Sequence, residues 1–225
     1  MRPLLALLVI VAVAAPALSQ RTGDSQAKPQ ATRYWLDPEY QRWLVEYEKK
    51  RDALEQARAL DIVGVKPGMT VGEVGAGNGY FALKIAERVG PTGTVYANDI
   101  VENFLAELRE RARERGFSNI KTVLGTKTDP RLPAGTMDFV FMVQVFWHLS
   151  DPVEVLDGIA ASLKPGAKLI LVEHESGKIF HEGRVVQEHT REIILNVVSR
   201  SRFRVDRIDT SLPAPGWAVV VLALK

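Results

Sequence analysis

Short apolar runs alternate along this chain with stretches whose apolar residues recur every three or four positions. The helix-type spacing is clear, for example, for Phe81, Ile85 and Val89. The apolar runs predict strands at 71–74, 94–98, 120–124, 137–143 and 168–173. The other stretches predict helices at 80–89, 101–116, 152–163 and 185–198. Strands and helices that alternate in this way predict an α/β fold with a doubly wound, mostly parallel sheet.

The end of the chain departs from this alternation. Two apolar runs, 203–209 and 217–224, follow each other with no helical stretch between them. We therefore expect them to form an antiparallel pair at one edge of the sheet. Residues 174–183 are rich in His, Glu and Gly, and we expect a loop there before the helix at 185–198.

The first residues have the pattern of an export signal. Residues 4–15 are continuously apolar behind Arg2, and the small residues Ala17 and Ser19 stand at the −3 and −1 positions of a cleavage site before Gln20. This pattern predicts a signal peptide and a periplasmic or secreted protein, with an uncleaved signal anchor as the alternative. The apolar run is shorter than the roughly 20 residues of a membrane-spanning helix, so we expect no stable span after cleavage.

A polar leader and a helical segment follow the predicted signal peptide of residues 1–19. Residues 20–33 are rich in Ser, Thr, Gln and Lys, and we expect them to be disordered. Asp37 followed by Pro38 is typical of a helix start. We expect a single domain at 34–225, whose first part, 34–62, is a helical cover.

Composition narrows the possible functions. Lys and Arg number 29 against 27 Asp and Glu, a net charge of +2, so nothing favours nucleic acid as a partner. The chain has no cysteine, which excludes disulfides, thiolate catalysis and cysteine metal sites. The spacing of His174, His181 and His189 matches no compact ligand motif, and we expect no metal.

Three alternating glycines, Gly75, Gly77 and Gly79, connect the first predicted strand to the first helix. Glycine lets a backbone approach a ligand closely, and a helix start presents unpaired N–H groups. Asp99 ends the second strand about 20 residues further on, where a carboxylate can accept hydrogen bonds from ribose hydroxyls. Asp99 can also cap the following helix. The loop is therefore expected to bind a nucleoside-type cofactor.

The loop differs from the fingerprint of NAD-binding proteins. That fingerprint is G-x-G-x-x-G, whereas this chain has G-x-G-x-G and Tyr80 at the third glycine position. Glu73, directly before the loop, adds negative charge where a pyrophosphate would lie. A cofactor with an ammonium group fits this junction better, and an NAD-dependent oxidoreductase is the less favoured hypothesis.

Four segments, in order, resemble those of the class I S-adenosylmethionine-dependent methyltransferases. They are Glu73–Gly79, Val95–Asp99, Leu132–Val140 with Val145–Pro152, and Leu163–Val172. The resemblance implies a Rossmann-like sheet of about seven strands with an antiparallel last strand. It also implies that S-adenosylmethionine is the cofactor.

The same resemblance implies roles for individual residues in cofactor binding. The glycines approach the methionine and ribose portions, Glu73 helps hold the amino group, and Asp99 binds the ribose hydroxyls. Ile100 packs against adenine, and Gln144 lines the methionine side. Many relatives have Gly-Asp-Ala after the third strand, where this chain has a longer loop, and Asp129 is expected to substitute there. The full set is Glu73, Gly75, Gly77, Gly79, Asp99, Ile100, Asp129 and Gln144.

The acceptor of the methyl group is less well specified. A base is needed only if the acceptor must lose a proton, and His148, after the fourth strand, is the candidate; a locally hydrogen-bonded histidine is the alternative. Glu173, His174 and Glu175 follow at the end of the fifth strand. The Asn-Pro-Pro-Tyr signature of adenine methyltransferases is absent, so we expect a small-molecule or protein side-chain acceptor. The alternative is an exported cofactor-binding module without turnover.

Overall fold

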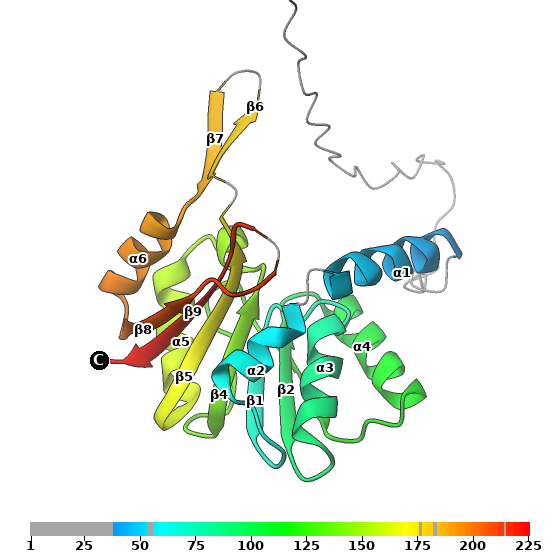
Figure 1. Ribbon diagram of the computed structural model, residues 1–225. Helices are drawn as coiled ribbons and strands as arrows, with labels where there is room; N and C mark the ends of the chain where they lie inside the picture. Colours follow the sequence, from blue (N-terminus) through cyan, green and yellow to red (C-terminus); the bar gives the residue numbers. More distant parts are fainter. Residues whose placement is uncertain (1–37, 54–55, 176, 182–183, 214) are drawn as a thin grey trace, which may run out of the picture. The chain divides into compact units, whose positions relative to one another are not determined.

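The computed structural model describes residues 38–225 except 54–55, 176, 182–183 and 214 (Figure 1). The predicted signal peptide, 1–19, and leader, 20–33, lie outside the described residues. The described residues belong to one compact unit, 35–225. Within them, no helix combines the length and the apolar character needed to cross a membrane.

A seven-stranded sheet forms the centre of the described part of the chain, in the order β3-β2-β1-β4-β5-β9-β8. The strands are β1 (Thr70–Val74), β2 (Thr94–Asp99), β3 (Ile120–Leu124), β4 (Met137–Val143), β5 (Leu163–His174), β8 (Phe203–Asp209) and β9 (Trp217–Leu224). The pairs from β3 to β5 are parallel, and β9 runs antiparallel to β5 and β8. The predicted doubly wound sheet and its antiparallel edge pair are confirmed.

Side chains alternate between the two faces of the sheet, and both faces are covered. In β4, Phe141 and Val143 pack in one cluster, whereas Val140 and Met142 pack in the other. Helices α2 (Ala59–Val63), α3 (Tyr80–Val89) and α4 (Glu102–Glu114) contribute to the first cluster. Helices α5 (Pro152–Ser162) and α6 (Arg191–Arg200) cover the second (Figure 1). Burial on both faces explains why the strands are nearly continuous apolar runs.

The predicted helical segment at 34–62 forms several pieces. Its described parts are α1 (Pro38–Ala53), the 3-10 turn η2 (Gln56–Arg58) and α2. Gly64, at a φ of 77°, ends α2, because glycine adopts the left-handed conformation without strain.

The prediction for residues 174–198 is partly wrong. Instead of a loop and a helix from 185, the chain forms an antiparallel pair of strands, β6 (Gly177–His181) and β7 (Arg184–His189). Helix α6 begins only at Arg191. The adjacent β-branched residues Val185 and Val186 favour a strand, and pairing with β6 supplies the backbone hydrogen bonds that a helix would otherwise provide.

Candidate functional site

The three glycines of the loop after β1 have left-handed backbones but different surroundings. Their φ angles are 76°, 54° and 90° at Gly75, Gly77 and Gly79. An added Cβ would lie 2.4 Å from Val145 Cγ2 at Gly75 and 2.0 Å from Leu108 Cδ1 at Gly79. At Gly77 the same atom would meet no described atom within 4 Å. Packing therefore requires Gly75 and Gly79, whereas Gly77 faces open space that a ligand can occupy.

Asp99, at the end of β2, holds the glycine loop in place. Its Oδ2 accepts a hydrogen bond from Gly77 N at 2.8 Å, and its Oδ1 accepts one from Val101 N at 2.9 Å. Helix α4 begins one residue later, at Glu102, so Asp99 forms a turn before the helix and is not its N-cap. Each carboxylate oxygen can accept a further bond, so the side chain, 8% exposed, is still able to bind a hydroxyl group.

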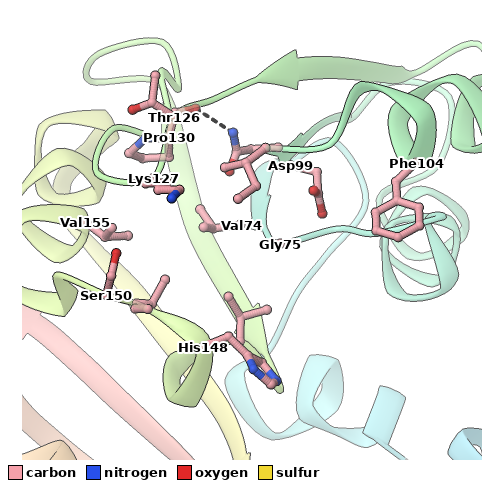
Figure 2. A pocket seen from close by; sticks show the side chains of 14 residues that line it. Val74, Gly75, Asp99, Phe104, Thr126, Lys127, Pro130, His148, Ser150 and Val155 are labelled. Atoms are coloured by element: carbon pink, nitrogen blue, oxygen red, sulfur yellow. Dashed lines mark hydrogen bonds between the residues drawn. The ribbon is translucent and has the colours of Figure 1, made fainter. Parts of the chain in front are cut away.

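A cavity of about 480 Å³ lies at the carboxyl ends of β1, β2 and β4. We call it the first pocket. Asp99 and Phe104 lie on one side of it, and Ser150 and Val155 on the other (Figure 2). It forms where the strand order reverses beside β1, the usual ligand position in such sheets. The full lining is Val74, Gly75, Asn98, Asp99, Ile100, Phe104, Thr126, Lys127, Pro130, Val145, His148, Leu149, Ser150 and Val155.

A second cavity, of about 420 Å³, adjoins the carboxyl ends of β4 and β5, and we call it the second pocket. His148 lines both pockets, which places them side by side. Gln144, at the end of β4, has a φ of 58°, a strained value for a residue with a side chain, and such strain is frequent at functional sites. The full lining is Lys50, Gln144, Trp147, His148, Glu173, His174, His189 and Trp217.

Glu173 brings a buried carboxylate to the second pocket. Its Oε1 accepts hydrogen bonds from Val145 N at 2.9 Å and Phe146 N at 2.8 Å. Its Oε2 has no hydrogen-bond partner among the described residues. Burial of this side chain, which is 1% exposed, raises its pKa to about 7 despite the two backbone hydrogen bonds, which lower it. A carboxyl group that titrates near neutral pH can act as a base.

Two aromatic pairs form walls of the second pocket. The His189 ring stacks on Trp147, with centroids 4.6 Å apart and planes 7° apart, and His174 meets Trp217 edge to face at 5.3 Å. Burial lowers the pKa of His189, and the nearby His148 and His174 lower it further. Among the described residues, no group of three or more His, Asp or Glu side chains is arranged to hold a metal ion.

The other predicted site residues have different positions. Glu73 is buried at 2% exposure in β1 and, like Gly77 and Gly79, is not part of either pocket lining. Asp129 is exposed, its Oδ1 accepts a hydrogen bond from Arg131 N at 2.8 Å, and the first pocket is lined by its neighbours instead. The structure thus brings Gly75, Asp99, Ile100 and His148 to the first pocket, and Gln144 and His148 to the second.

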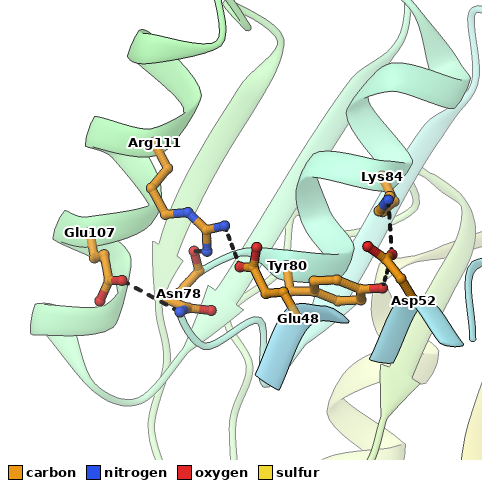
Figure 3. A network of polar contacts seen from close by, with 7 residues as sticks. All are labelled: Glu48, Asp52, Asn78, Tyr80, Lys84, Glu107 and Arg111. Carbon is orange, nitrogen blue, oxygen red and sulfur yellow. Dashed lines mark hydrogen bonds and ion pairs between the residues drawn. The ribbon is translucent and has the colours of Figure 1, made fainter. Parts of the chain in front are cut away.

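Helix α1 contacts the glycine loop through a polar network that the sequence pattern does not reveal. Its Asp52 accepts a hydrogen bond from Tyr80 Oη at 2.5 Å, next to Gly79. Its Glu48 pairs with Arg111 of α4, which also donates to the carbonyl of Asn78 at 3.0 Å (Figure 3). The network therefore joins α1, α4 and the loop.

Several lining residues were not predicted from sequence. Lys50, on α1, and the tryptophans Trp147 and Trp217 reach the second pocket from segments far apart in the chain. The sequence does contain a feature that could have identified each tryptophan as a lining residue. Trp147 directly precedes the candidate base His148, and Trp217 begins an apolar strand. Nothing in the local pattern indicated Lys50, because its position depends on how α1 packs.

Comparisons with known proteins agree with this geometry. Residues 72–171 match the family model described as a methyltransferase domain. The nocamycin O-methyltransferase of Saccharothrix syringae is 42% identical over 83 residues, which are 37% of this chain and 30% of that protein. The demethylmenaquinone methyltransferase of Anoxybacillus flavithermus is 29% identical over 124 residues, 55% of this chain and 52% of that protein. The chain thus spans about a third to a half of the length of these curated relatives.

A solved structure shares the fold over most of the described chain. The crystal structure of a SAM-dependent methyltransferase from Aquifex aeolicus has a TM-score of 0.65 at 25% identity, and covers 74% of this chain and 88% of that one. The strand order, the glycine loop and Asp99 at the end of β2 are therefore explained together: residues 72–171 form a methyltransferase domain with the fold of the class I S-adenosylmethionine-dependent methyltransferases, whose cofactor is S-adenosylmethionine.

Proposed function

We propose that this protein transfers a methyl group from S-adenosylmethionine to a small-molecule acceptor. The observation that carries the proposal is the open space at Gly77 next to the Asp99-lined first pocket, in a loop whose other two glycines are fixed by packing. The backbone at Gly77 has no described atom beside it, and Gly75 lines the first pocket, so a ligand can approach the loop closely and the loop fits the group that the family uses.

Residues of the first pocket are suited to the nucleoside part of the cofactor. Asp99 would accept hydrogen bonds from the ribose hydroxyls, and Ile100 and Phe104 would pack against the adenine. Glu73 is proposed to help hold the amino group and Gln144 to line the methionine side. When bound, the cofactor supplies an electrophilic methyl carbon on a sulfonium. The protein then has to align the acceptor and exclude water.

The second pocket is proposed as the acceptor site. Its volume of about 420 Å³ is in the range of small-molecule sites, and it adjoins the first pocket at His148. The printed names of the two curated relatives also refer to small molecules, nocamycin and demethylmenaquinone. These observations favour a small-molecule acceptor over a protein side chain.

Calorimetry with S-adenosylmethionine tests the cofactor site. Gly77→Val would fill the open space, and we expect it to weaken binding about tenfold or more, because the backbone could no longer be approached. Gly116→Val is the matched control, since Gly116 also has a positive φ, of 74°, with no described atom near its Cβ, but lies between α4 and β3, outside both pocket linings. Unchanged affinity in Gly77→Val would contradict the proposal.

A further inference from the structure

A role in holding the neighbouring turn explains only one of the two carboxylate oxygens of Glu173. Its Oε1 already satisfies both N–H groups at the start of the 3-10 turn η3 (Phe146–His148). Its Oε2 is buried without a hydrogen-bond partner among the described residues, which is costly for a carboxylate. The same side chain lines a cavity of about 420 Å³, so a ligand in that cavity can supply the missing donor.

The other walls of the second pocket indicate which kind of donor fits. Aromatic rings line the cavity, namely the stacked pair of Trp147 and His189 and the pair of Trp217 and His174, and such walls suit a planar ring. The described lining otherwise carries Lys50, Gln144 and three histidines around the single carboxylate of Glu173. The cationic side chain of Lys50 disfavours a cationic acceptor, and it stabilises negative charge that develops on an acceptor oxygen.

We propose that the second pocket binds a planar acceptor with an ionisable aromatic hydroxyl group, and that Glu173 Oε2 is the base that takes the hydroxyl proton. This inference rests on the proposed methyl transfer and names its acceptor class and its base. It assigns the role of base to Glu173 in place of His148, which lies between the two pockets. The raised pKa of Glu173 suits a base that works near neutral pH.

The proposed step is balanced as follows in atoms and charge. The O–H bond of the acceptor breaks as an O–H bond to Glu173 Oε2 forms. The acceptor oxygen uses the freed electron pair to bond the methyl carbon, whose bond to the cofactor's sulfur breaks and leaves a neutral thioether. Glu173 then releases its proton to solvent. No oxidant, reductant or metal ion is needed.

The test measures binding of matched probes to the full chain, loaded with S-adenosylhomocysteine, by quenching of tryptophan fluorescence. The probes are 2-naphthol, 2-methoxynaphthalene, which lacks the hydroxyl proton, and 2-naphthylmethylammonium, which is a cation. Naphthol binding is expected to strengthen as the pH rises through about 7, because only the ionised Glu173 accepts the hydroxyl proton in a hydrogen bond. The methyl ether should bind more weakly and with a smaller pH dependence.

Glu173→Gln separates the proposed role from the structural one, because the amide oxygen can still accept the two backbone hydrogen bonds. We expect it to weaken naphthol binding about tenfold near pH 8, to remove most of the pH dependence, and to leave the methyl ether almost unaffected. The histidines and Lys50 remain in the variant, so the difference reports Glu173. Glu175→Gln is the control, because Glu175 pairs with Arg191 at 2.8 Å and is not part of the pocket lining.

The results that overturn the proposal are specific. They are naphthol binding no tighter than that of the methyl ether, tighter binding of the ammonium probe, or the same pH profile in Glu173→Gln as in the parent. The first two comparisons use the parent protein and do not depend on how the variant folds. Loss of S-adenosylhomocysteine binding by the parent would instead count against the proposed function.

Discussion

At the scale of single residues, the structure separates positions that look equivalent in the sequence. The motif predicts a cofactor loop with three glycines, but only atomic packing shows that Val145 and Leu108 occupy the space beside two of them. Likewise, Glu173 is one of three polar residues at the end of a strand, and only the fold buries it under the turn at Val145 and Phe146. The motif identifies the region, and long-range packing determines the role of each residue.

Alanine substitutions in the loop test this difference. Gly79→Ala should destabilise the protein by about 2–4 kcal/mol, because its Cβ would overlap Leu108 and its φ is left-handed. Gly77→Ala should cost only about 1 kcal/mol, since it adds strain but no overlap. Urea denaturation of both variants measures the difference. Equal losses of stability in the two variants would show that Leu108 moves aside to make room for the new Cβ.

The buried carboxyl group also predicts a pH dependence of stability. The pKa of Glu173 is raised to about 7 in the folded protein from an ordinary value of 4.5, so the folded state binds the proton more tightly. Its contribution to stability is therefore present at low pH and is lost as the pH rises through about 7. Between about pH 4 and pH 8, the parent should lose up to about 3 kcal/mol more stability than Glu173→Gln.

Urea denaturation at the two pH values gives this difference. Other titrating groups are common to both proteins, so their contributions largely cancel. If the free energy of unfolding changes with pH by the same amount in the parent and in the variant, the pKa of Glu173 is not raised.

At the scale of elements, local patterns predicted most strands and helices but not how α1 packs. The strand runs and the helix starts at Pro38 and Pro152 follow from periodicity and capping, and Asp151 does cap α5 by accepting from Glu154 N. The β6–β7 pair was not predicted, because each of these strands is stabilised by pairing with the other and not by a pattern within its own residues. The contact of Glu48 with Arg111 spans 63 residues and leaves no local signal.

The α1 network is expected to support cofactor binding. Arg111→Gln removes both the partner of Glu48 and a donor to the carbonyl of Asn78 in the glycine loop. We expect the affinity for S-adenosylmethionine to fall about three- to tenfold, because the pair is largely buried and orders the loop. Calorimetry measures the change.

The matched control lies two residues further along α4. Arg113→Gln removes an exposed pair with Glu110, and exposed pairs contribute little, so its affinity should equal that of the parent. If the two variants behave alike, α1 does not support the loop.

At the scale of the whole molecule, the predicted signal peptide would place the protein outside the cytoplasm, whereas its cofactor is made in the cytoplasm. We propose that the protein is exported and processed before Gln20, on the basis of the apolar run at 4–15 and the small residues Ala17 and Ser19. Cell fractionation with N-terminal sequencing should find a chain that begins at Gln20 outside the cytoplasm. A cytoplasmic chain that retains Met1 would contradict this prediction.

The most direct test of the proposed function is methyl transfer itself. The purified protein would be incubated with S-adenosylmethionine labelled on the methyl group and with fractionated extract of the source cells. We predict label in the small-molecule fraction and formation of S-adenosylhomocysteine, with both lost in Gly77→Val and retained in Gly116→Val. Cofactor binding without transfer to any fraction would indicate a binding module, and label confined to proteins would contradict a small-molecule acceptor.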